Sequence, residues 1–334
     1  MRIGVVGAGA VGGTIAAILH LDGHDVTVTA RGAHLEAIRS SGLRVGGAFG
    51  EIEARVGAAS ALSARPDLAF VTTKANSAVE AMRGSAAALA GVPVVVVQNG
   101  LGALSSGALA LPDSPLVGGL ALFAASYVAP GSVFVTAAAS IYLGGDDPEA
   151  TELARAVLSP VVPTLVSDNF AGAQWTKLVV NQVNALPAIT GMSVQEVVGD
   201  PGLRRLLTRS MREAVAVARA RGIRFAPLQG LSERMLCAFA LAPTGLAELL
   251  PRAMAARMGA VPNPGSTLQS IRRGQATEVD HLNGAVVAEA AIAGTTAPIN
   301  AALTALVHEV EAGGRFIPPA EVVARVWLGL RTPQ

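Results

Sequence analysis

The chain begins with MRIGVVGAGAVGGTIAAILHL, residues 1–21, and this stretch decides the fold. Ile3 to Val6 is a short apolar run that meets glycine at once, as a buried parallel strand does. Residues 7–12 read G-x-G-x-x-G, and Val11 to Leu21 follows with a helical pattern. This pattern between a strand and a helix is the fingerprint of a dinucleotide-binding loop. A glycine-rich turn without a ligand is the alternative.

Each glycine of this loop has its own physical task. Gly7 permits the tight turn, Gly9 lets the backbone approach a pyrophosphate, and Gly12 lets helix and strand pack closely. The helix N-terminus then offers free N–H groups to the phosphates. The predicted cofactor loop therefore consists of Gly7, Ala8, Gly9, Ala10, Val11 and Gly12.

The end of the second strand indicates which dinucleotide is bound. Asp25 to Thr29 reads as this strand, and Ala30 and Arg31 follow it without a carboxylate that would bind a ribose 2′-hydroxyl. A guanidinium at Arg31 can instead pair with a 2′-phosphate. The sequence therefore predicts NADPH as the cofactor. A solvated arginine in a turn is the alternative.

The remaining first half alternates between strands and helices, which predicts a Rossmann-type α/β domain over residues 1–170. We expect a strand-rich stretch at Val117–Gly145, in which Val133–Val135 and Ile141–Leu143 are the last strands. The other elements expected are a helix at Ala33–Ser40, a hairpin-like stretch at Leu43–Val56, a strand at Leu68–Thr72, a helix at Ser77–Leu89 and a strand at Val92–Val97.

Long helical patterns dominate after residue 170, so we expect an all-helical domain over residues 171–334. The expected helices include Trp175–Leu186, Gly202–Arg221 and Glu278–Ala293. The clearest loop of this half is Pro262–Ser266. We expect this half to bind the substrate and to be capable of forming a homodimer.

Composition and charge exclude several classes of protein. The 334 residues suffice for two domains, and the net charge of +1 comes without a run of Lys or Arg. This argues against nucleic acid or an anionic membrane as the main partner. The glycines that interrupt residues 1–19 argue against a signal peptide, so the cytoplasm is the expected location. The single cysteine, Cys237, cannot form an internal disulfide and reads as a small buried hydrophobe.

Polar residues follow two buried strands of the first half. Thr72-Thr73-Lys74 comes after one strand and Gln98-Asn99-Gly100 after the next. Ligands of open α/β sheets bind at these carboxyl ends, so Lys74 and Asn99 are candidate site residues. An ordinary turn is the alternative for Asn99-Gly100.

A polar stripe marks the helix expected at Trp175–Leu186. Lys177, Asn181 and Asn184 stand at i, i+4 and i+7, which places them on one helix face. An exposed face usually carries Glu, Lys and Arg rather than asparagines, so this stripe indicates a polar ligand site. An ordinary exposed face is the alternative.

These motifs together resemble the ketopantoate reductase family, the NADPH-dependent 2-dehydropantoate 2-reductases and their paralogues. The resemblance covers essentially the whole chain. Its motifs are G-x-G-x-x-G at residues 7–12, Thr73-Lys74, Gln98-Asn99-Gly100, Trp175-x-Lys177-Leu178-x-x-Asn181, and Ser266-x-x-Gln269 followed by Thr277-Glu278-x-Asp280-x-x-Asn283-Gly284.

The resemblance implies roles for individual residues. Lys177 matches the general acid of the family, and Glu278 matches the glutamate that holds the substrate hydroxyl. Lys74 matches a residue near the nicotinamide. The substrate-binding candidates are Asn99, Asn181, Asn184, Asn263 and Ser266, and Asn99 is also a cofactor-binding candidate. No metal is expected. The implied reaction is the reduction of 2-dehydropantoate, or another 2-oxo acid, by NADPH.

The chain departs from the family pattern in two places. The family usually carries a second asparagine eight residues after the catalytic lysine, but here that position is Ala185 and the asparagine is Asn184. One step along a helix rotates a side chain by about 100°. Ser270 stands where the family has aspartate. A paralogue that reduces a different ketone or 2-oxo acid is therefore one alternative, and a non-catalytic NADP(H)-binding regulator is another.

Overall fold

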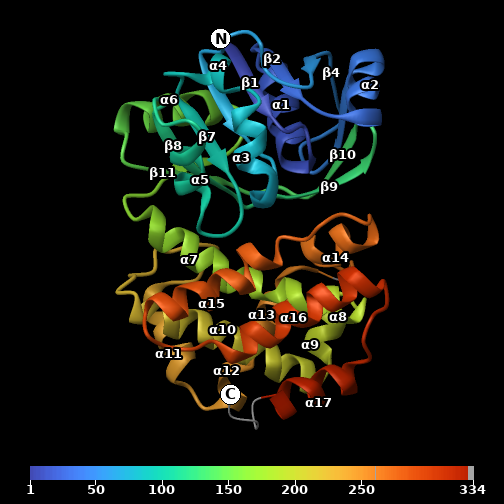
Figure 1. Cartoon of the computed structure of the whole chain (residues 1–334), viewed down its shortest axis with the longest axis vertical. Coiled ribbons are helices and arrows are strands. Elements are labelled where there is room, and N and C mark those ends of the chain that lie inside the picture. The colour runs from blue at the N-terminus through green and yellow to red at the C-terminus, as the bar shows by residue number, and fades with distance from the viewer. Residues whose placement is uncertain (260, 330–334) are drawn as a thin grey trace. The chain divides into compact units, whose positions relative to one another are not determined.

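The computed structural model describes residues 1–259 and 261–329 of the chain (Figure 1). The chain divides into two compact units, one over Met1–Phe170 and one that begins at Ala171. Among the described residues, no helix is both long and apolar enough to cross a membrane.

The first unit is an α/β fold built on an eight-stranded sheet. Its strand order is β12-β11-β8-β7-β6-β1-β2-β5, and the pairs from β5 to β8 are parallel. The six strands from β5 to β8 therefore have the order of a Rossmann fold. The strands are β1 (Arg2–Val6), β2 (Asp25–Thr29), β5 (Gly57–Ala59), β6 (Leu68–Val71), β7 (Val94–Val97), β8 (Leu116–Ala121), β11 (Ile141–Gly144) and β12 (Thr164–Val166).

A second, four-stranded sheet has the order β4-β3-β10-β9. Its strands are β3 (Leu43–Gly47), β4 (Ile52–Ala54), β9 (Ala124–Ala129) and β10 (Ser132–Ala137). The helices of this unit are α1 (Ala10–Leu21), α2 (Gly32–Ser41), α3 (Ala75–Arg83), α4 (Ala86–Leu89), α5 (Ala103–Ala110) and α6 (Pro148–Leu158).

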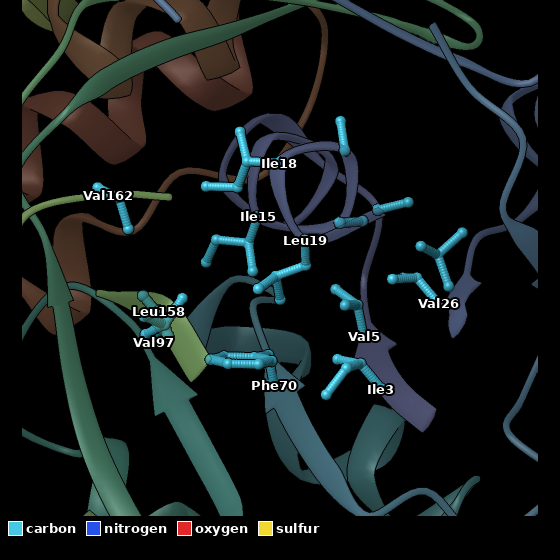
Figure 2. Close-up of a cluster of buried hydrophobic side chains, with 14 of the residues drawn as sticks. Ile3, Val5, Ile15, Ile18, Leu19, Val26, Phe70, Val97, Leu158 and Val162 are labelled. Carbon is cyan, nitrogen blue, oxygen red and sulfur yellow. The ribbon is translucent and has the colours of Figure 1, made fainter. Parts of the chain in front are cut away.

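Helix α1 is buried because it packs against both sheets. Figure 2 shows Ile15 and Leu19 of α1 gathered with Val5 of β1 and Phe70 of β6. On the second sheet, a Cβ added to Gly13 would lie 3.1 Å from the Val133 side chain. The helix whose N-terminus follows the glycine-rich loop is thus fixed on two sides.

The second unit is rich in helices. Helix α10 (Pro201–Ala220) lies at its centre, and the helices that contact it include α9 (Val194–Gly199), α11 (Glu233–Leu241), α15 (Asn283–Ile292), α16 (Pro298–Gly313) and α17 (Pro319–Gly329). The remaining elements are α7 (Phe170–Asn181), η1 (Gln182–Asn184), α8 (Ala185–Thr190), α12 (Thr244–Ala247), α13 (Leu249–Arg257), α14 (Gly265–Arg272) and η2 (Val279–His281).

The local sequence explains where α10 begins. The side chain of Asp200 accepts a hydrogen bond from the Leu203 N–H at 2.8 Å, and Pro201 occupies the first turn. Both features are typical of helix N-termini. Leu206, Met211 and Val215 are buried along this helix, so burial of its apolar side accounts for its central place.

The predicted Rossmann-type fold and the helix-rich second half are confirmed, but several predicted elements are wrong in detail. The helix predicted at Ser77–Leu89 is divided into α3 and α4, because α3 ends at Arg83 and Gly84 follows it. Strand β12 follows the strands that were expected to be the last. The helix predicted from Glu278 begins instead as the short 3₁₀ helix η2, and α15 starts at Asn283.

The helix predicted at Trp175–Leu186 is also wrong. It is interrupted, because α7 ends at Asn181 and Asn184 lies in the 3₁₀ segment η1. Pro187 has no N–H to donate to the carbonyl of Val183, so a continuous α-helix would lack a hydrogen bond there. The Asn184 side chain also donates to the Asn181 carbonyl at 3.0 Å. Lys177 and Asn181 remain one turn apart on α7, but Asn184 does not continue their face.

Candidate active site

The glycine-rich loop between β1 and α1 has no room for larger side chains at two positions. Gly7 has a φ of +102°, and a Cβ there would lie 2.6 Å from the methyl group of Thr73. A Cβ on Gly12 would lie 2.0 Å from the Gly7 carbonyl oxygen. Gly9, by contrast, has no atom within 4 Å of its Cβ position. The loop is therefore tightly packed on the protein side and open at Gly9, as a pyrophosphate cradle requires.

His34 on α2 holds this loop, although the sequence pattern did not identify it. Its Nε2 lies 2.6 Å from the carbonyl oxygen of Ala8, and its Nδ1 accepts a hydrogen bond from the Gly131 N–H at 2.9 Å. Since Nδ1 accepts, Nε2 must be the donor to Ala8. The ring also packs edge-on against Tyr127. His34 therefore joins the glycine-rich loop to the turn between β9 and β10.

Arg31 lies at the start of α2, directly after β2. Its guanidinium forms an ion pair with Glu80 of α3 at 3.2 Å, and both side chains are more than 70% exposed. Such an exposed pair contributes little to stability. The guanidinium is thus accessible to a ligand, but a ligand phosphate would compete with Glu80 for it.

Thr72, Thr73 and Gln98 form a polar cluster at the ends of β6 and β7. The Thr72 hydroxyl donates to the Gly7 carbonyl at 2.6 Å, which ties β6 to the glycine-rich loop. The Gln98 side chain donates through Nε2 to the Thr73 carbonyl at 3.0 Å. Lys74 comes next, before α3, and Asn99 follows Gln98; both are partly buried. These residues lie at the carboxyl edge of the sheet, where the sequence predicted a ligand site.

Helix α7 of the second unit carries Lys177 and Asn181, both partly buried. Desolvation lowers the pKa of Lys177 from its usual 10.5 to about 8, although the Coulombic attraction of the Glu278 carboxylate raises it. Lys177 and Glu278 therefore belong to one electrostatic site, despite lying about a hundred residues apart in the sequence. An amine with this pKa can give and regain a proton near neutral pH.

The segment that carries Glu278 is fastened to α16. The Thr277 N–H donates to the Glu311 carboxylate at 2.7 Å. His308 lies between two carboxylates, with Nε2 at 2.9 Å from Asp280 and Nδ1 at 2.7 Å from Glu311. The hydrogen bond to Asp280, with a further one to Glu311, raises the pKa of His308. These contacts hold the backbone on both sides of Glu278.

A network of buried polar side chains joins η1, α10, α15 and α16. The amide oxygen of Gln182 accepts from the Asn283 side chain at 2.7 Å and from the Ser210 hydroxyl at 2.9 Å. Asn283 also donates to the side-chain oxygen of Asn300 at 3.0 Å, and the Ser210 hydroxyl oxygen lies at the same distance from that oxygen. All four residues are at most 1% exposed. The network joins the segment after Lys177 to the segment after Glu278, and Gln182 was not among the predicted site residues.

Asn184, Asn263 and Ser266 meet at the start of α14. The Asn184 side-chain oxygen accepts from the Ser266 N–H at 3.2 Å, and the Asn263 side-chain oxygen accepts from the Gly265 N–H at 2.9 Å. Gln195 fixes this loop by accepting from the Asn263 N–H at 2.9 Å. Asn184 is 7% exposed, whereas Ser266 is exposed. The structure thus brings these three predicted residues together, with Asn184 turned toward the protein.

Two profiles of one protein family match the two halves of the chain. Residues 3–147 match the profile described as ketopantoate reductase PanE/ApbA, and residues 169–311 match the one described as its C-terminal part. The chain belongs to the ketopantoate reductase family. The resemblance inferred from the motifs is thereby confirmed.

Full-length relatives of this family member are named for the same oxidoreductase. A 2-dehydropantoate 2-reductase from Pyrococcus horikoshii is 28% identical over 94% of this chain and 99% of the relative. One from Archaeoglobus fulgidus is 29% identical over 93% of this chain and 98% of the relative. The crystal structure of a PanE/ApbA family ketopantoate reductase from Ralstonia eutropha JMP134 has a TM-score of 0.79 and 29% identity, covering 94% and 99% of the two chains.

This ketopantoate reductase family member carries its candidate residues as one set in each unit. The first unit holds the glycine-rich loop with Arg31, Lys74 and Asn99. The candidates in the second unit are Lys177, Asn181, Asn184, Asn263, Ser266 and Glu278. Within residues 1–259 and 261–329, no group of three or more His, Cys, Asp or Glu side chains could hold a metal ion. The chemistry that these sets offer consists of anion binding in the first and proton transfer in the second.

Proposed function

We propose that this chain catalyses the NADPH-dependent reduction of a 2-oxo acid, with 2-dehydropantoate as the substrate. The observation that carries this proposal is Lys177, whose pKa of about 8 beside Glu278 suits an acid that must be protonated near neutral pH. A family of 2-dehydropantoate 2-reductases provides the second support.

The first unit is proposed to bind the cofactor. The pyrophosphate would lie on Gly7, Ala8, Gly9, Ala10, Val11 and Gly12, where the space beside Gly9 fits it. Arg31 would pair with the 2′-phosphate, and Lys74 and Asn99 would complete the binding set. When bound, the dinucleotide supplies the hydride for the reduction.

The second unit is proposed to bind the substrate and supply the proton. Lys177 would hold its ammonium group at the ketone oxygen, stabilise the charge that develops there and donate a proton to it. Glu278 would accept a hydrogen bond from the substrate hydroxyl, while it also keeps the Lys177 pKa from falling further. Proton transfer by Lys177 leaves a neutral amine, which solvent reprotonates between turnovers.

The polar contacts to the substrate carboxylate and carbonyl are proposed to come from neutral donors. Asn181 lies one turn after Lys177 on α7, and the exposed Ser266 hydroxyl lies at the start of α14. Asn263 and Asn99 are further members of this set. Asn184 is proposed to belong to the substrate site by fixing the backbone of Ser266.

A second candidate is a paralogue that reduces a different 2-oxo acid. Ala185 favours it, because the family usually has asparagine there and this side chain is 1% exposed. A non-catalytic NADP(H)-binding regulator is the third reading, and the desolvated Lys177 argues against it, because a sensor needs no proton donor.

NADPH oxidation with a panel of 2-oxo acids tests the proposal. The panel contains 2-dehydropantoate, its analogue without the hydroxyl, and aryl and alkyl 2-oxo acids. Highest kcat/KM with 2-dehydropantoate is expected, with a loss for the deoxy analogue because Glu278 would lack its partner. Turnover of another compound alone would select the paralogue. Binding of NADPH without turnover of any compound would select the regulator.

A further inference from the structure

Two buried polar atoms at the carboxyl edge of the first unit's sheet have no hydrogen-bond partner among the described residues. They are the hydroxyl oxygen of Thr73 and the side-chain oxygen of Gln98. Gln98 as a whole is 6% exposed. Buried side-chain polar atoms in native proteins nearly always have a hydrogen-bond partner. Two such atoms without a partner at the edge where ligands bind therefore indicate that a ligand supplies it.

The position of both atoms is fixed by the protein. The Gln98 Nε2 donates to the Thr73 carbonyl at 3.0 Å, and this bond decides that Oε1 is the end of the amide left without a partner. The Thr73 side chain packs against the glycine-rich loop, since a Cβ on Gly7 would lie 2.6 Å from its methyl group. The two buried atoms therefore lie next to the glycine-rich loop.

The strand order indicates which part of a dinucleotide reaches them. The glycine-rich loop follows β1, and β1 lies between β2 on one side and β6, then β7, on the other. Arg31 follows β2, so a 2′-phosphate bound there places the adenosine half over β2. The nicotinamide riboside half then extends over β6 and β7, whose ends carry Thr73 and Gln98.

We propose that Thr73 and Gln98 form a subsite for the nicotinamide riboside half of the cofactor. The Gln98 oxygen accepts a hydrogen bond from an N–H or O–H of that half, which comes from either the carboxamide or a ribose hydroxyl. The Thr73 hydroxyl, which can donate or accept, makes a second bond beside it. This proposal rests on the cofactor part of the proposed function and on no statement about the substrate.

Calorimetric titration of the purified full-length chain tests the subsite without any turnover. The probes are NADPH and adenosine 2′,5′-bisphosphate, which lacks the nicotinamide riboside. Thr73→Val removes the hydroxyl and keeps the shape, and Thr73→Ser keeps the hydroxyl as the matched control. Loss of one neutral hydrogen bond should weaken NADPH binding by about threefold to tenfold in Thr73→Val and in Gln98→Leu. Thr73→Ser should bind like the unchanged chain.

The two probes separate the subsite from a general disturbance. Adenosine 2′,5′-bisphosphate should bind all variants equally, and thermal unfolding of each variant reports whether it is folded. Equal losses for both probes would overturn the proposal, as would unchanged NADPH affinity in Thr73→Val and Gln98→Leu, which would mean that water satisfies these atoms. If the unchanged chain binds neither NADPH nor NADH, this proposal and the cofactor part of the proposed function both fail.

A third probe identifies the donor. Reduced 3-acetylpyridine adenine dinucleotide phosphate has a methyl group in place of the carboxamide nitrogen. If Gln98 accepts from the carboxamide, Gln98→Leu should bind this analogue as well as the unchanged chain does. If Gln98 accepts from a ribose hydroxyl, the loss should persist with the analogue. Both results support the subsite and differ only in the group that it recognises.

Discussion

The side-chain oxygen of Asn184 accepts a hydrogen bond from the backbone N–H of Ser266 at 3.2 Å. This contact joins two segments 82 residues apart, and the Asn184 nitrogen donates in turn to the Asn181 carbonyl. The same side chain therefore contacts the backbone of two proposed substrate residues, Ser266 and Asn181.

Asn184→Ala should separate the structural and chemical roles at this position. It removes the acceptor of the Ser266 N–H in a part-buried hydrogen bond, so the free energy of unfolding should fall by about 0.5–1.5 kcal/mol. The loosened Ser266 segment should also raise the KM for the 2-oxo acid. Ser266→Ala is the matched control, because it keeps the backbone N–H and removes only an exposed hydroxyl. It should lower kcat/KM without changing stability. Equal unfolding free energies for Asn184→Ala and the unchanged chain would contradict this role.

Lys177→Ala should lower kcat by about 10²–10⁴-fold, since that is the usual contribution of a general acid. NADPH affinity, measured by calorimetry, should be nearly unchanged. Because Lys177 must be protonated to donate and its pKa is about 8, kcat/KM for reduction should fall as the pH rises through about 8. A rate that stays level up to the ordinary lysine pKa would show that the acid is another group.

Glu278→Gln should lower the pH at which kcat/KM begins to fall. The Glu278 carboxylate raises the pKa of Lys177, so its removal should lower that pKa and shift the fall in kcat/KM to a pH below about 8. A purely structural role would reduce the rate at every pH by the same factor. The pH profile of kcat/KM, recorded with the same 2-oxo acid for both proteins, distinguishes the two.

Arg31→Ala should weaken NADPH binding by roughly tenfold to a hundredfold, the effect of losing a charge-assisted contact to the 2′-phosphate. NADH binding should not change, because NADH lacks that phosphate. Glu80→Gln is the opposite test. Glu80 pairs with Arg31 at 3.2 Å and would repel a phosphate, so its neutral variant should bind NADPH up to about fivefold more tightly. Equal use of NADH and NADPH by the unchanged chain would rule out this role for Arg31.

The features that could be predicted from sequence are those that depend on neighbouring residues. The glycine-rich loop and its flanking strand and helix are contiguous, so the Rossmann-type unit was predicted correctly. The break in the helix after Lys177 was missed, although Pro187 signalled it locally. It determines that Asn184 packs toward α14 instead of continuing the face of Lys177 and Asn181.

Long-range contacts explain what the sequence pattern could not provide. His34 is connected to Ala8 and Gly131, which lie 26 and 97 residues away, and nothing local distinguishes it from an ordinary helical histidine. Gln182 and Asn283 meet across 101 residues in a buried network. Such partners become visible only when the helices are packed, and the same holds for the effect of Glu278 on the pKa of Lys177.

Ala185→Asn tests whether the departure from the family pattern determines the substrate. The side chain at this position is 1% exposed, so an asparagine would bury an amide. Without partners, this would lower the free energy of unfolding by about 1–3 kcal/mol. We expect that loss, together with a kcat/KM for 2-dehydropantoate that does not increase, because the α8 backbone directs this side chain into the protein. The measurements are thermal unfolding and NADPH oxidation with the 2-oxo acid panel. A variant with unchanged stability and a higher kcat/KM for 2-dehydropantoate would contradict this expectation. It would show that the missing amide is what separates this chain from an efficient 2-dehydropantoate 2-reductase.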